Sequence, residues 1–320
     1  MKAAQINKYG GYEVFEINND APKPTVGEGK VLVEVYAASI NPFDKAVRAG
    51  FMKNMMPLNF SAILGGDFAG VVKEIGEGVT EFKVGDEVFG SANIFSGGSG
   101  SFAEFATAKA RNAAIKPKNI TFEQVGALPL VGSSAVQALE EHMNLHNDQK
   151  ILIHGGAGGI GHIAIQLAKT LGAYVVTTVS GNDKDFVKQL GADEVIDYKN
   201  EKFEEKIKDP STGSGQVFDA VFDTVGGEVT NKSLQVLKKG GVLVSMIGEP
   251  DAKFAEEREI TAIRQGTKVN TKHLERLAQL IENGKIKVNI AKIFPLDQIQ
   301  DAFKYQEELH SRGKIVLKIR

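Results

Sequence analysis

The feature that most constrains how this chain folds is a glycine-rich turn at residues 155–161, GGAGGIG. A short apolar run, ILIH at 151–154, comes directly before the turn. After it, apolar residues recur every three or four positions from Ile160 to Leu171, which is the spacing of one helix face. This segment is therefore predicted to form a buried strand, a tight turn and an amphipathic helix.

The turn also has the spacing G-x-G-x-x-G, formed by Gly156, Gly158 and Gly161. We expect Gly156 to permit the tight turn, Gly158 to let a pyrophosphate approach, and Gly161 to let the helix pack on the strand. The N–H groups at the start of the helix would bind the phosphates. A purely structural turn is the alternative, but the flanking strand and helix favour a dinucleotide site. Its expected contacts are Gly156, Ala157, Gly158, Gly159 and Ile160.

The end of the next predicted strand indicates which dinucleotide binds. An NAD site expects an acid about 20 residues after the glycines, to accept hydrogen bonds from the ribose. Here the strand is followed by Ser180, with Lys184 nearby, and these groups suit a 2′-phosphate. Asp183 argues for NAD, and Ser180 could simply cap a helix beside a solvated Lys184. The balance favours NADP(H).

The rest of the chain predicts two domains with different textures. Residues 1–122 contain short strands broken by turns, and residues 123–270 alternate strands with helices, which is typical of a parallel sheet. Residues 271–320 resemble the first part again, so we expect the chain to return to that domain. The fold class is α/β, a Rossmann-type doubly wound sheet plus a mostly β domain. The second domain's expected strands are 150–154, 174–179, 194–197, 220–224 and 241–246, and its expected helices are 160–171, 184–190, 202–208 and 229–237.

Composition excludes several classes of function. The 320 residues carry 38 Lys and Arg against 40 Asp and Glu, so there is no basic excess for nucleic acid or an anionic membrane. There is no cysteine, which excludes disulfides, thiol nucleophiles and thiolate metal sites. No apolar stretch is long enough to predict a signal peptide or a membrane helix, so we expect a cytoplasmic protein.

Six short motifs, in order and correctly spaced, resemble the zinc-independent branch of the medium-chain dehydrogenase/reductase superfamily, which includes quinone oxidoreductases, zeta-crystallins and enone reductases. They are VYAASINPFD at 35–44, GGDFAG at 65–70, VGDEVF at 84–89, GSFAEF at 100–105, ALPLVGSSAVQAL at 127–139, and LGAD with YK within 190–199. The resemblance covers essentially the whole chain. It implies a GroES-like catalytic domain at the N-terminus. It also implies a homodimer joined by edge strands near 241–246.

The resemblance implies roles for particular residues of the cofactor site. Asn41 is implied at the nicotinamide and substrate pocket, and Ser134 near the nicotinamide-side phosphate or ribose. The implied contacts of the 2′-phosphate are Ser180, Lys184 and Tyr198. This set agrees with the independent reading of Ser180 and Lys184.

The same comparison predicts a site without metal. Zinc-containing relatives place a cysteine within 39–42 and the triplet G-H-E at 65–67, whereas this chain has Asn41, Gly66 and Asp67 at these places. The six histidines show no ligand pattern. The resemblance implies Asn41 as a catalytic candidate, and Lys45, which follows shortly after it, is either an oxyanion donor or a surface lysine. Some relatives carry a tyrosine where Phe43 stands, so no proton donor is assigned there.

Without a Lewis acid, an electrophilic acceptor is needed. We therefore expect NADPH-dependent reduction of a quinone or an α,β-unsaturated carbonyl compound by hydride transfer. Two alternatives stay open. An enoyl-thioester reductase of the same fold would need a basic groove for its carrier, and an NADPH-binding protein with little turnover would keep the cofactor residues alone.

Overall fold

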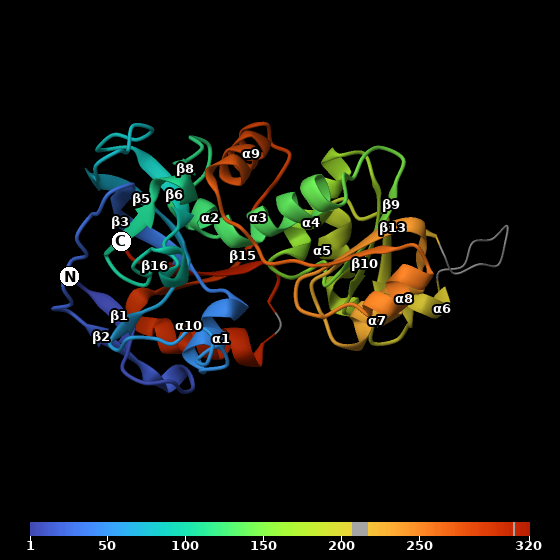
Figure 1. Cartoon of the computed structure of the whole chain (residues 1–320), viewed down its shortest axis with the longest axis horizontal. Coiled ribbons are helices and arrows are strands. Elements are labelled where there is room, and N and C mark those ends of the chain that lie inside the picture. Colours follow the sequence, from blue (N-terminus) through green and yellow to red (C-terminus); the bar gives the residue numbers. More distant parts are fainter. Residues whose placement is uncertain (207–216, 310) are drawn as a thin grey trace. The chain divides into compact units, whose positions relative to one another are not determined.

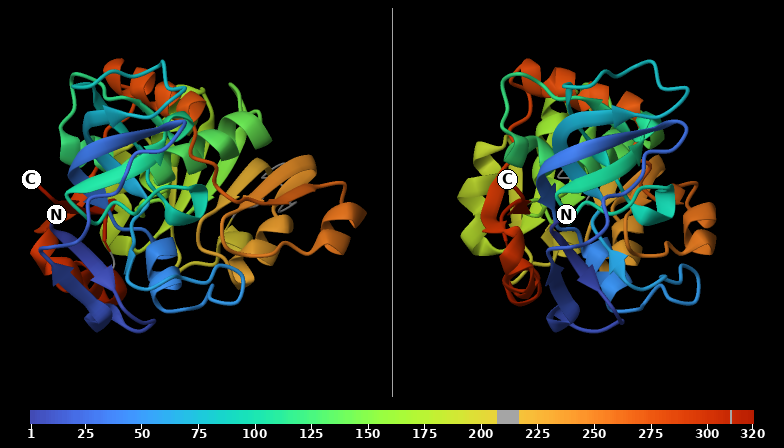
Figure 2. Two further views of the ribbon diagram at one scale, coloured as in Figure 1. Left: turned by 60° about the vertical axis from the view of Figure 1, so that its left-hand side comes forward. Right: turned by 90° about the vertical axis from the view of Figure 1, so that its left-hand side faces the viewer.

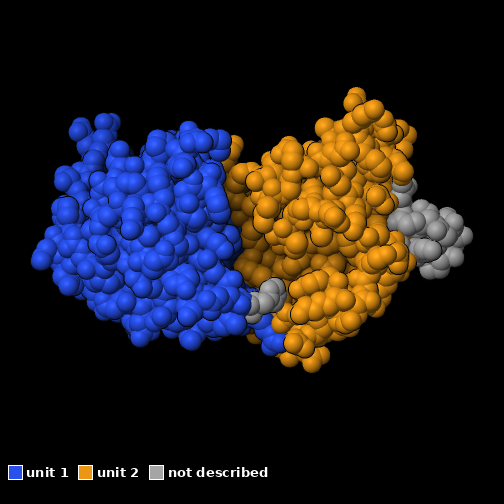
Figure 3. Space-filling model, turned by 90° about the horizontal axis from the view of Figure 1, so that it is seen from below, with its two compact units in different colours: residues 1–133, 269–283, 288–320 blue, residues 134–268, 284–287 orange. Residues whose placement is uncertain are grey.

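The computed structural model describes residues 1–206, 217–309 and 311–320, which form two compact units (Figure 1). Unit 1 comprises residues 1–133, 269–283 and 288–320, and unit 2 comprises residues 134–268 and 284–287 (Figure 3). The first crossing thus lies beyond residue 122, because the helix α2 (Phe122–Gly126) packs on strands of unit 1 and buries Val125 there. The chain returns to unit 1 after residue 268, close to the expected position.

Unit 2 contains a six-stranded parallel sheet in the described part of the chain. Its strand order is β11-β10-β9-β12-β13-β14, which is the doubly wound order expected for dinucleotide-binding folds. The strands are β9 (Lys150–His154), β10 (Tyr174–Val179), β11 (Glu194–Asp197), β12 (Phe218–Asp223), β13 (Leu237–Ser245) and β14 (Thr261–Arg264). Leu152, Val176 and Val221 are fully buried, as expected for parallel strands covered on both faces.

Helices connect these strands and cover the sheet. α4 packs on β9 and β10, α7 on β12 and β13, α5 on β11 and α8 on β14. Their bounds are α4 (Gly161–Thr170), α5 (Lys184–Gln189), α6 (Phe203–Lys206), α7 (Glu228–Leu234) and α8 (Ala252–Glu257). The expected helix 202–208 corresponds to α6, and its last two residues lie outside the described residues.

One expectation about the sheet is wrong. β13 is hydrogen-bonded to β12 on one side and β14 on the other, so residues 241–246 are interior and have no free edge to offer a second copy. Among the described strands of this sheet, β14 is the edge on this side and β11 is the edge on the other. The four residues of β14, TAIR, alternate too weakly to signal a strand in the sequence.

Unit 1 is built mainly from a seven-stranded sheet, again counting described residues. The order is β15-β16-β3-β5-β6-β8, with β7 also paired to β3, and a small sheet β2-β1-β4 lies apart. Figures 1 and 2 show the dark-blue strands β1 and β2 beside the red helix α10, where the Phe15 and Phe303 rings stack. The strands are β1 (Ala3–Ile6), β2 (Phe15–Asn18), β3 (Lys30–Ser39), β4 (Ala62–Ile63), β5 (Asp67–Ile75), β6 (Glu87–Ser91), β7 (Phe105–Lys109), β8 (Ala113–Ile115), β15 (Ile290–Pro295) and β16 (Lys314–Lys318).

Four helices complete the framework. They are α1 (Pro42–Arg48), α3 (Pro129–Val136), α9 (Thr271–Glu282) and α10 (Ile299–Glu308). The stretch from Phe122 to His142 is divided into α2, α3 and a π-helical turn, Gln137–His142. Pro129 starts α3, because a proline favours the first turn of a new helix over a helix interior. No helix among the described residues has the length and apolar character that a membrane span requires.

Candidate functional site

The glycine turn of unit 2 has the predicted strand–turn–helix form, but the roles of its individual glycines differ from those expected. Gly155, not Gly156, has the positive φ, +73°, that a side chain would strain. Glycine is needed at position 156 because the turn lies close to β10: a Cβ there would lie 2.1 Å from Thr177 Oγ1. A Cβ at Gly161 would lie 2.2 Å from the Gly155 carbonyl oxygen, so α4 can start close to the strand only with glycine there.

Gly158 differs from these, because the only atom that its Cβ would approach within 4 Å is the Gly155 oxygen, at 3.3 Å. The backbone at Gly158 is therefore open on the side where a pyrophosphate is expected. The turn follows β9, which lies between β10 and β12, where the strand order reverses. Ligands of open α/β sheets bind at this reversal, beyond the carboxyl ends of the strands. The residues here thus fit a dinucleotide.

The two histidines beside the turn are packing residues, as expected. His154 is buried, with Nδ1 3.0 Å from Thr178 Oγ1 and Nε2 3.0 Å from Ser233 Oγ. Burial lowers the pKa of the His154 imidazole to about 4, so it is neutral at pH 7. His162 Nδ1 lies 3.0 Å from the Gly158 carbonyl oxygen and supports the turn from within.

Of the expected 2′-phosphate residues, Ser180 and Lys184 follow β10, and Tyr198 follows the neighbouring strand β11, where its backbone N–H donates to the Val179 carbonyl oxygen at 3.2 Å. Ser180 is buried and its hydroxyl donates to Asp183 Oδ2 at 2.7 Å. The Asn200 side chain lowers the pKa of the Asp197 carboxyl by hydrogen bonding, and the nearby positive charge of Lys184 acts in the same direction. Lys184 is exposed, and Tyr198 is 53 % exposed. This end of the site thus places the exposed ammonium group of Lys184 near the Asp197 carboxylate.

Ser134 belongs to unit 2 and is fully buried. Its Oγ lies 2.7 Å from Thr267 Oγ1, and its carbonyl oxygen accepts from Gln265 Nε2 at 3.1 Å. These contacts hold the first helical residue of unit 2 against the segment after β14.

In unit 1, Asn41 is the centre of a buried polar cluster. Its Nδ2 donates to Asp67 Oδ2 at 2.8 Å, and its Oδ1 accepts from Lys314 Nζ. Lys314 Nζ also donates to the Ile40 carbonyl oxygen at 2.9 Å and lies 3.8 Å from Asp67 Oδ2. Asp67 further accepts from Ser39 Oγ at 2.9 Å. Both ends of the Asn41 carboxamide are therefore fixed.

In this cluster, burial and the attraction between opposite charges shift the pKa values of the ionisable groups in opposite directions. Burial raises the pKa of Asp67 and lowers that of Lys314, and in each case the attraction between the two groups opposes the shift. The cluster joins side chains of β3, β5 and β16, and these three strands are far apart in the sequence. Sequence reasoning missed Lys314, which looks like any lysine before an apolar strand.

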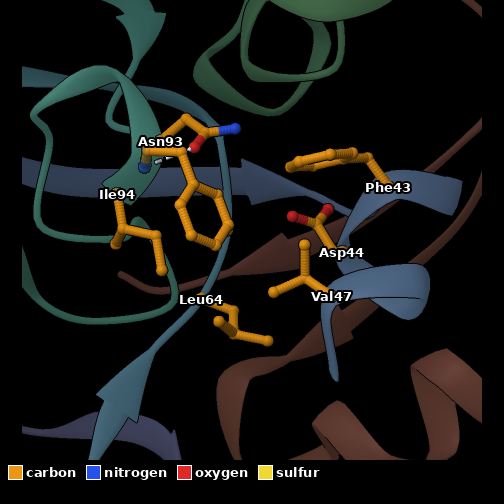
Figure 4. A pocket seen from close by; sticks show the side chains of 8 residues that line it. Phe43, Asp44, Val47, Leu64, Asn93 and Ile94 are labelled. Carbon is orange, nitrogen blue, oxygen red and sulfur yellow. Dashed lines mark hydrogen bonds between the residues drawn. The ribbon is translucent and has the colours of Figure 1, made fainter. Parts of the chain in front are cut away.

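A small cavity of about 10 Å³, with room for about one water molecule, lies next to α1 (Figure 4). Its walls are mostly apolar, and Asp44 is the one titratable group among them in the described chain. Figure 4 shows the Asp44 carboxyl group directed into the space, across from the wall with Asn93 and Ile94. The lining residues are Phe43, Asp44, Val47, Leu64, Gly65, Asn93, Ile94 and Phe95. A larger hollow of about 310 Å³, lined by residues from 57 to 99, shares Ile94 and Phe95 with it.

The structure separates the two catalytic candidates. Neither lines the cavity: Asn41 lies in the buried cluster, whereas the Lys45 ammonium lies 3.4 Å from Glu307 in an ion pair that is partly exposed. Of the two roles open to Lys45, this geometry corresponds to the surface lysine. Phe43 lines the cavity and meets Phe95 edge-on, with ring centroids 6.3 Å apart.

The glycines after Phe95, which have the composition of a loose loop, are instead held by hydrogen bonds. Gly98 N donates to the Asn93 carbonyl oxygen at 2.9 Å, and Gly100 N to that of Ala92 at 2.9 Å. Within the described ranges, no three His, Cys, Asp or Glu side chains are grouped so that they could hold a metal ion.

Comparisons with known proteins show the family of the chain. Residues 27–118 match the family described as alcohol dehydrogenase GroES-like domain, and residues 190–317 match the family described as zinc-binding dehydrogenase. A chloroplast envelope quinone oxidoreductase homolog of Arabidopsis thaliana is 33% identical over 99% of this chain and 98% of its own length. The NADPH-dependent alkenal/one oxidoreductase of the same plant is 35% identical over 99% of this chain and 79% of its own.

Among solved structures, the quinone oxidoreductase of Escherichia coli complexed with NADPH superposes with a TM-score of 0.88 at 28% identity, each chain covered completely. Fold and glycine turn define a two-domain, dinucleotide-binding oxidoreductase. The chain belongs to the medium-chain dehydrogenase/reductase superfamily, in the branch of quinone oxidoreductases and enone reductases.

Proposed function

We propose that the chain is an NADPH-dependent reductase of quinones or α,β-unsaturated carbonyl compounds, acting without a metal. The observation that carries this proposal is the lining of the two adjoining hollows of unit 1, which is mostly aromatic and aliphatic and in which Asp44 is the one titratable side chain of the described residues. Such a lining suits a flat, conjugated, uncharged substrate. The names of the relatives, a quinone oxidoreductase and an alkenal/one oxidoreductase, support it.

The chemistry follows from the groups present. Bound NADPH supplies a hydride. A quinone or an enone accepts it at a carbon conjugated with the carbonyl group, and the negative charge then spreads onto the oxygen. Neutral hydrogen-bond donors can stabilise that charge, each contributing a few kcal/mol in a dry pocket. An isolated ketone would instead leave a localised alkoxide, which calls for a Lewis acid or a strong proton donor.

Asn41 is the proposed donor. Its Nδ2 carries two hydrogens, and only one of them is needed for the bond to Asp67. The other is the hydrogen that we assign to the nicotinamide amide or the substrate oxygen. Lys314 and Asp67 hold the carboxamide plane, so this donor is preorganised rather than recruited from solvent.

A panel of matched substrates tests the function. NADPH consumption is followed with an enone, its saturated ketone, a simple quinone and the corresponding alcohol with NADP⁺. We expect turnover with the enone and the quinone only. If the saturated ketone or the alcohol reacts as fast, the proposed chemistry is wrong, and if nothing reacts, the chain is a binding protein.

An enoyl-thioester reductase is not favoured by a specific observation. Neither of the two hollows described in unit 1 has a lysine or arginine in its lining, whereas a phosphopantetheine or CoA carrier needs cations. The cytoplasmic location and the homodimer stay predictions. Some relatives are named chloroplastic or mitochondrial, and sedimentation of the purified protein would give the assembly state.

A further inference from the structure

Asp44 is a carboxylic acid in a buried position, where the ionised form of a carboxyl group is unfavourable. Its side chain is 5 % exposed and lies at the third position of α1, where Oδ2 accepts from the Asn41 backbone N–H at 2.8 Å. This bond orients the carboxyl group, and the backbone N–H of Gly65 also hydrogen-bonds to it. The carboxyl group points into the cavity between apolar walls (Figure 4).

The surroundings of Asp44 favour its protonated form. Burial raises the pKa of the Asp44 carboxyl to about 7, and the negative charge of Asp67 on β5 adds to the effect. The backbone N–H of Asn41 and the Lys314 ammonium on β16 act in the opposite direction, less strongly. A carboxyl with this pKa carries a proton in about half of the molecules at neutral pH, which suits general acid catalysis.

The other charges of α1 do not face the cavity. Lys45 and Arg48 both pair with Glu307 of α10, at 3.4 Å and 2.9 Å. The groups that set the charge state of Asp44 are therefore those of the buried cluster, Asp67 and Lys314, and not the surface ion pairs.

We propose that Asp44 is the acid that gives the substrate its proton when an enone is reduced. This inference rests on the proposed function. The hydride bonds to the β-carbon, the C=C electron pair moves to form an enolate, and the Asp44 O–H bond then breaks as a C–H bond forms at the α-carbon. The carboxylate that remains takes a proton from water, so that one enone, one NADPH and one H⁺ give the saturated ketone and NADP⁺.

Enones and quinones depend on this acid to different degrees. An enolate must be protonated on carbon, which is slow without a positioned acid. A reduced quinone needs protons only on oxygen, which exchanges rapidly with water. The ratio of enone to quinone turnover therefore reports on Asp44 separately from cofactor binding and hydride transfer.

Asp44→Asn is the decisive variant, because its amide oxygen can still accept the Asn41 N–H but the side chain has no acidic proton. We expect the ratio of enone to quinone turnover to fall by about 100-fold or more. Asp86→Asn is the matched control. Asp86 also accepts a backbone N–H from three residues earlier, that of Lys83 at 2.9 Å, but lies outside the cavity, so the ratio should stay unchanged.

Two measurements on the intact wild-type protein remain decisive even if Asp44→Asn does not fold. In D₂O, the α-deuterium should enter one face of the product only. Carbon-13 NMR of aspartate-labelled protein without NADPH should show one carboxyl titrating near pH 7, and enone turnover should decline above that pH while quinone turnover does not.

The possible outcomes distinguish a failure of this inference from a failure of the proposed function. Wild-type protein that reduces neither substrate overturns the proposed function. Wild-type protein that reduces both, with an Asp44→Asn ratio equal to that of Asp86→Asn, overturns only the role of Asp44. Deuterium on both faces, or no carboxyl titrating near pH 7, also overturns that role.

Discussion

Ser180 and Lys184 are the residues on which the predicted preference for NADPH over NADH rests. The Ser180 hydroxyl already donates to Asp183, so Lys184 is the side chain left with a full charge for a 2′-phosphate. We expect NADPH to bind at least about ten times more tightly than NADH, a difference of about 1.4 kcal/mol, which is modest for a charge-assisted contact.

Lys184→Ala should weaken NADPH binding and leave NADH binding nearly unchanged, as measured by fluorescence titration. Lys188→Ala removes the same charge from the same helix, α5, where Lys188 Nζ donates to the Asp193 carbonyl oxygen. This control should keep the preference for NADPH. Equal dissociation constants for the two cofactors in the wild-type protein would contradict the assignment.

At the scale of single residues, sequence motifs identify candidate site residues better than they identify the side chains that those residues contact. Asn41 and Ser180 could be selected from motifs, since local spacing carries that information. Lys314 could not, because its contacts to Asn41 and Asp67 depend on β16 pairing with β3, across most of the chain. The same holds for Lys45, whose partner Glu307 lies on α10.

Among the elements, the segment β9–turn–α4 places the most demands on its sequence. Gly156→Ala would push a Cβ to 2.1 Å from Thr177 Oγ1 and 2.9 Å from Ile165 Cδ1. Thr177 cannot simply rotate, because its hydroxyl donates to the Ile153 carbonyl oxygen at 2.7 Å. Overpacking of this kind typically costs about 1–3 kcal/mol. We therefore expect a lower melting temperature and NADPH binding weakened at least about tenfold.

Gly266→Ala is the control for this change in the same unit. A Cβ there meets nothing within 4 Å and its φ is not positive, so stability should stay the same or rise slightly. Gly156→Ala behaving like Gly266→Ala would show that the turn tolerates a side chain and that the contact with Thr177 is unimportant.

The elements also show why one part of the fold was predictable and another was not. Strands and helices of unit 2 repeat a local pattern, and β9 to β12 fall close to their expected ranges. β14 and β15 carry polar or mixed sequences at sheet edges, where only one side is paired, and their pattern is correspondingly weak. The position of β13 inside the sheet depends on β14, which explains the mistaken edge.

On the scale of the whole molecule, the two units differ in how their sequence is arranged. Residues 134–268 supply nearly all of unit 2 without interruption, whereas unit 1 is assembled from three separate stretches. Within unit 1, β16 lies between β15 and β3 and supplies Lys314 to the buried cluster. The cluster around Asn41 is therefore complete only when the last of these stretches is in place.

That arrangement imposes an order on biosynthesis. A ribosome releases β3 early, together with its partners β5 and β7, but its third partner, β16, emerges after all of unit 2. The nucleotide-binding half can therefore mature while the other half still lacks its last strand. Pulse proteolysis of nascent chains stalled before residue 314 should show protection of 134–268 and cleavage within 1–133. Protection of both stretches in such chains would mean that β3 finds a temporary cover during translation.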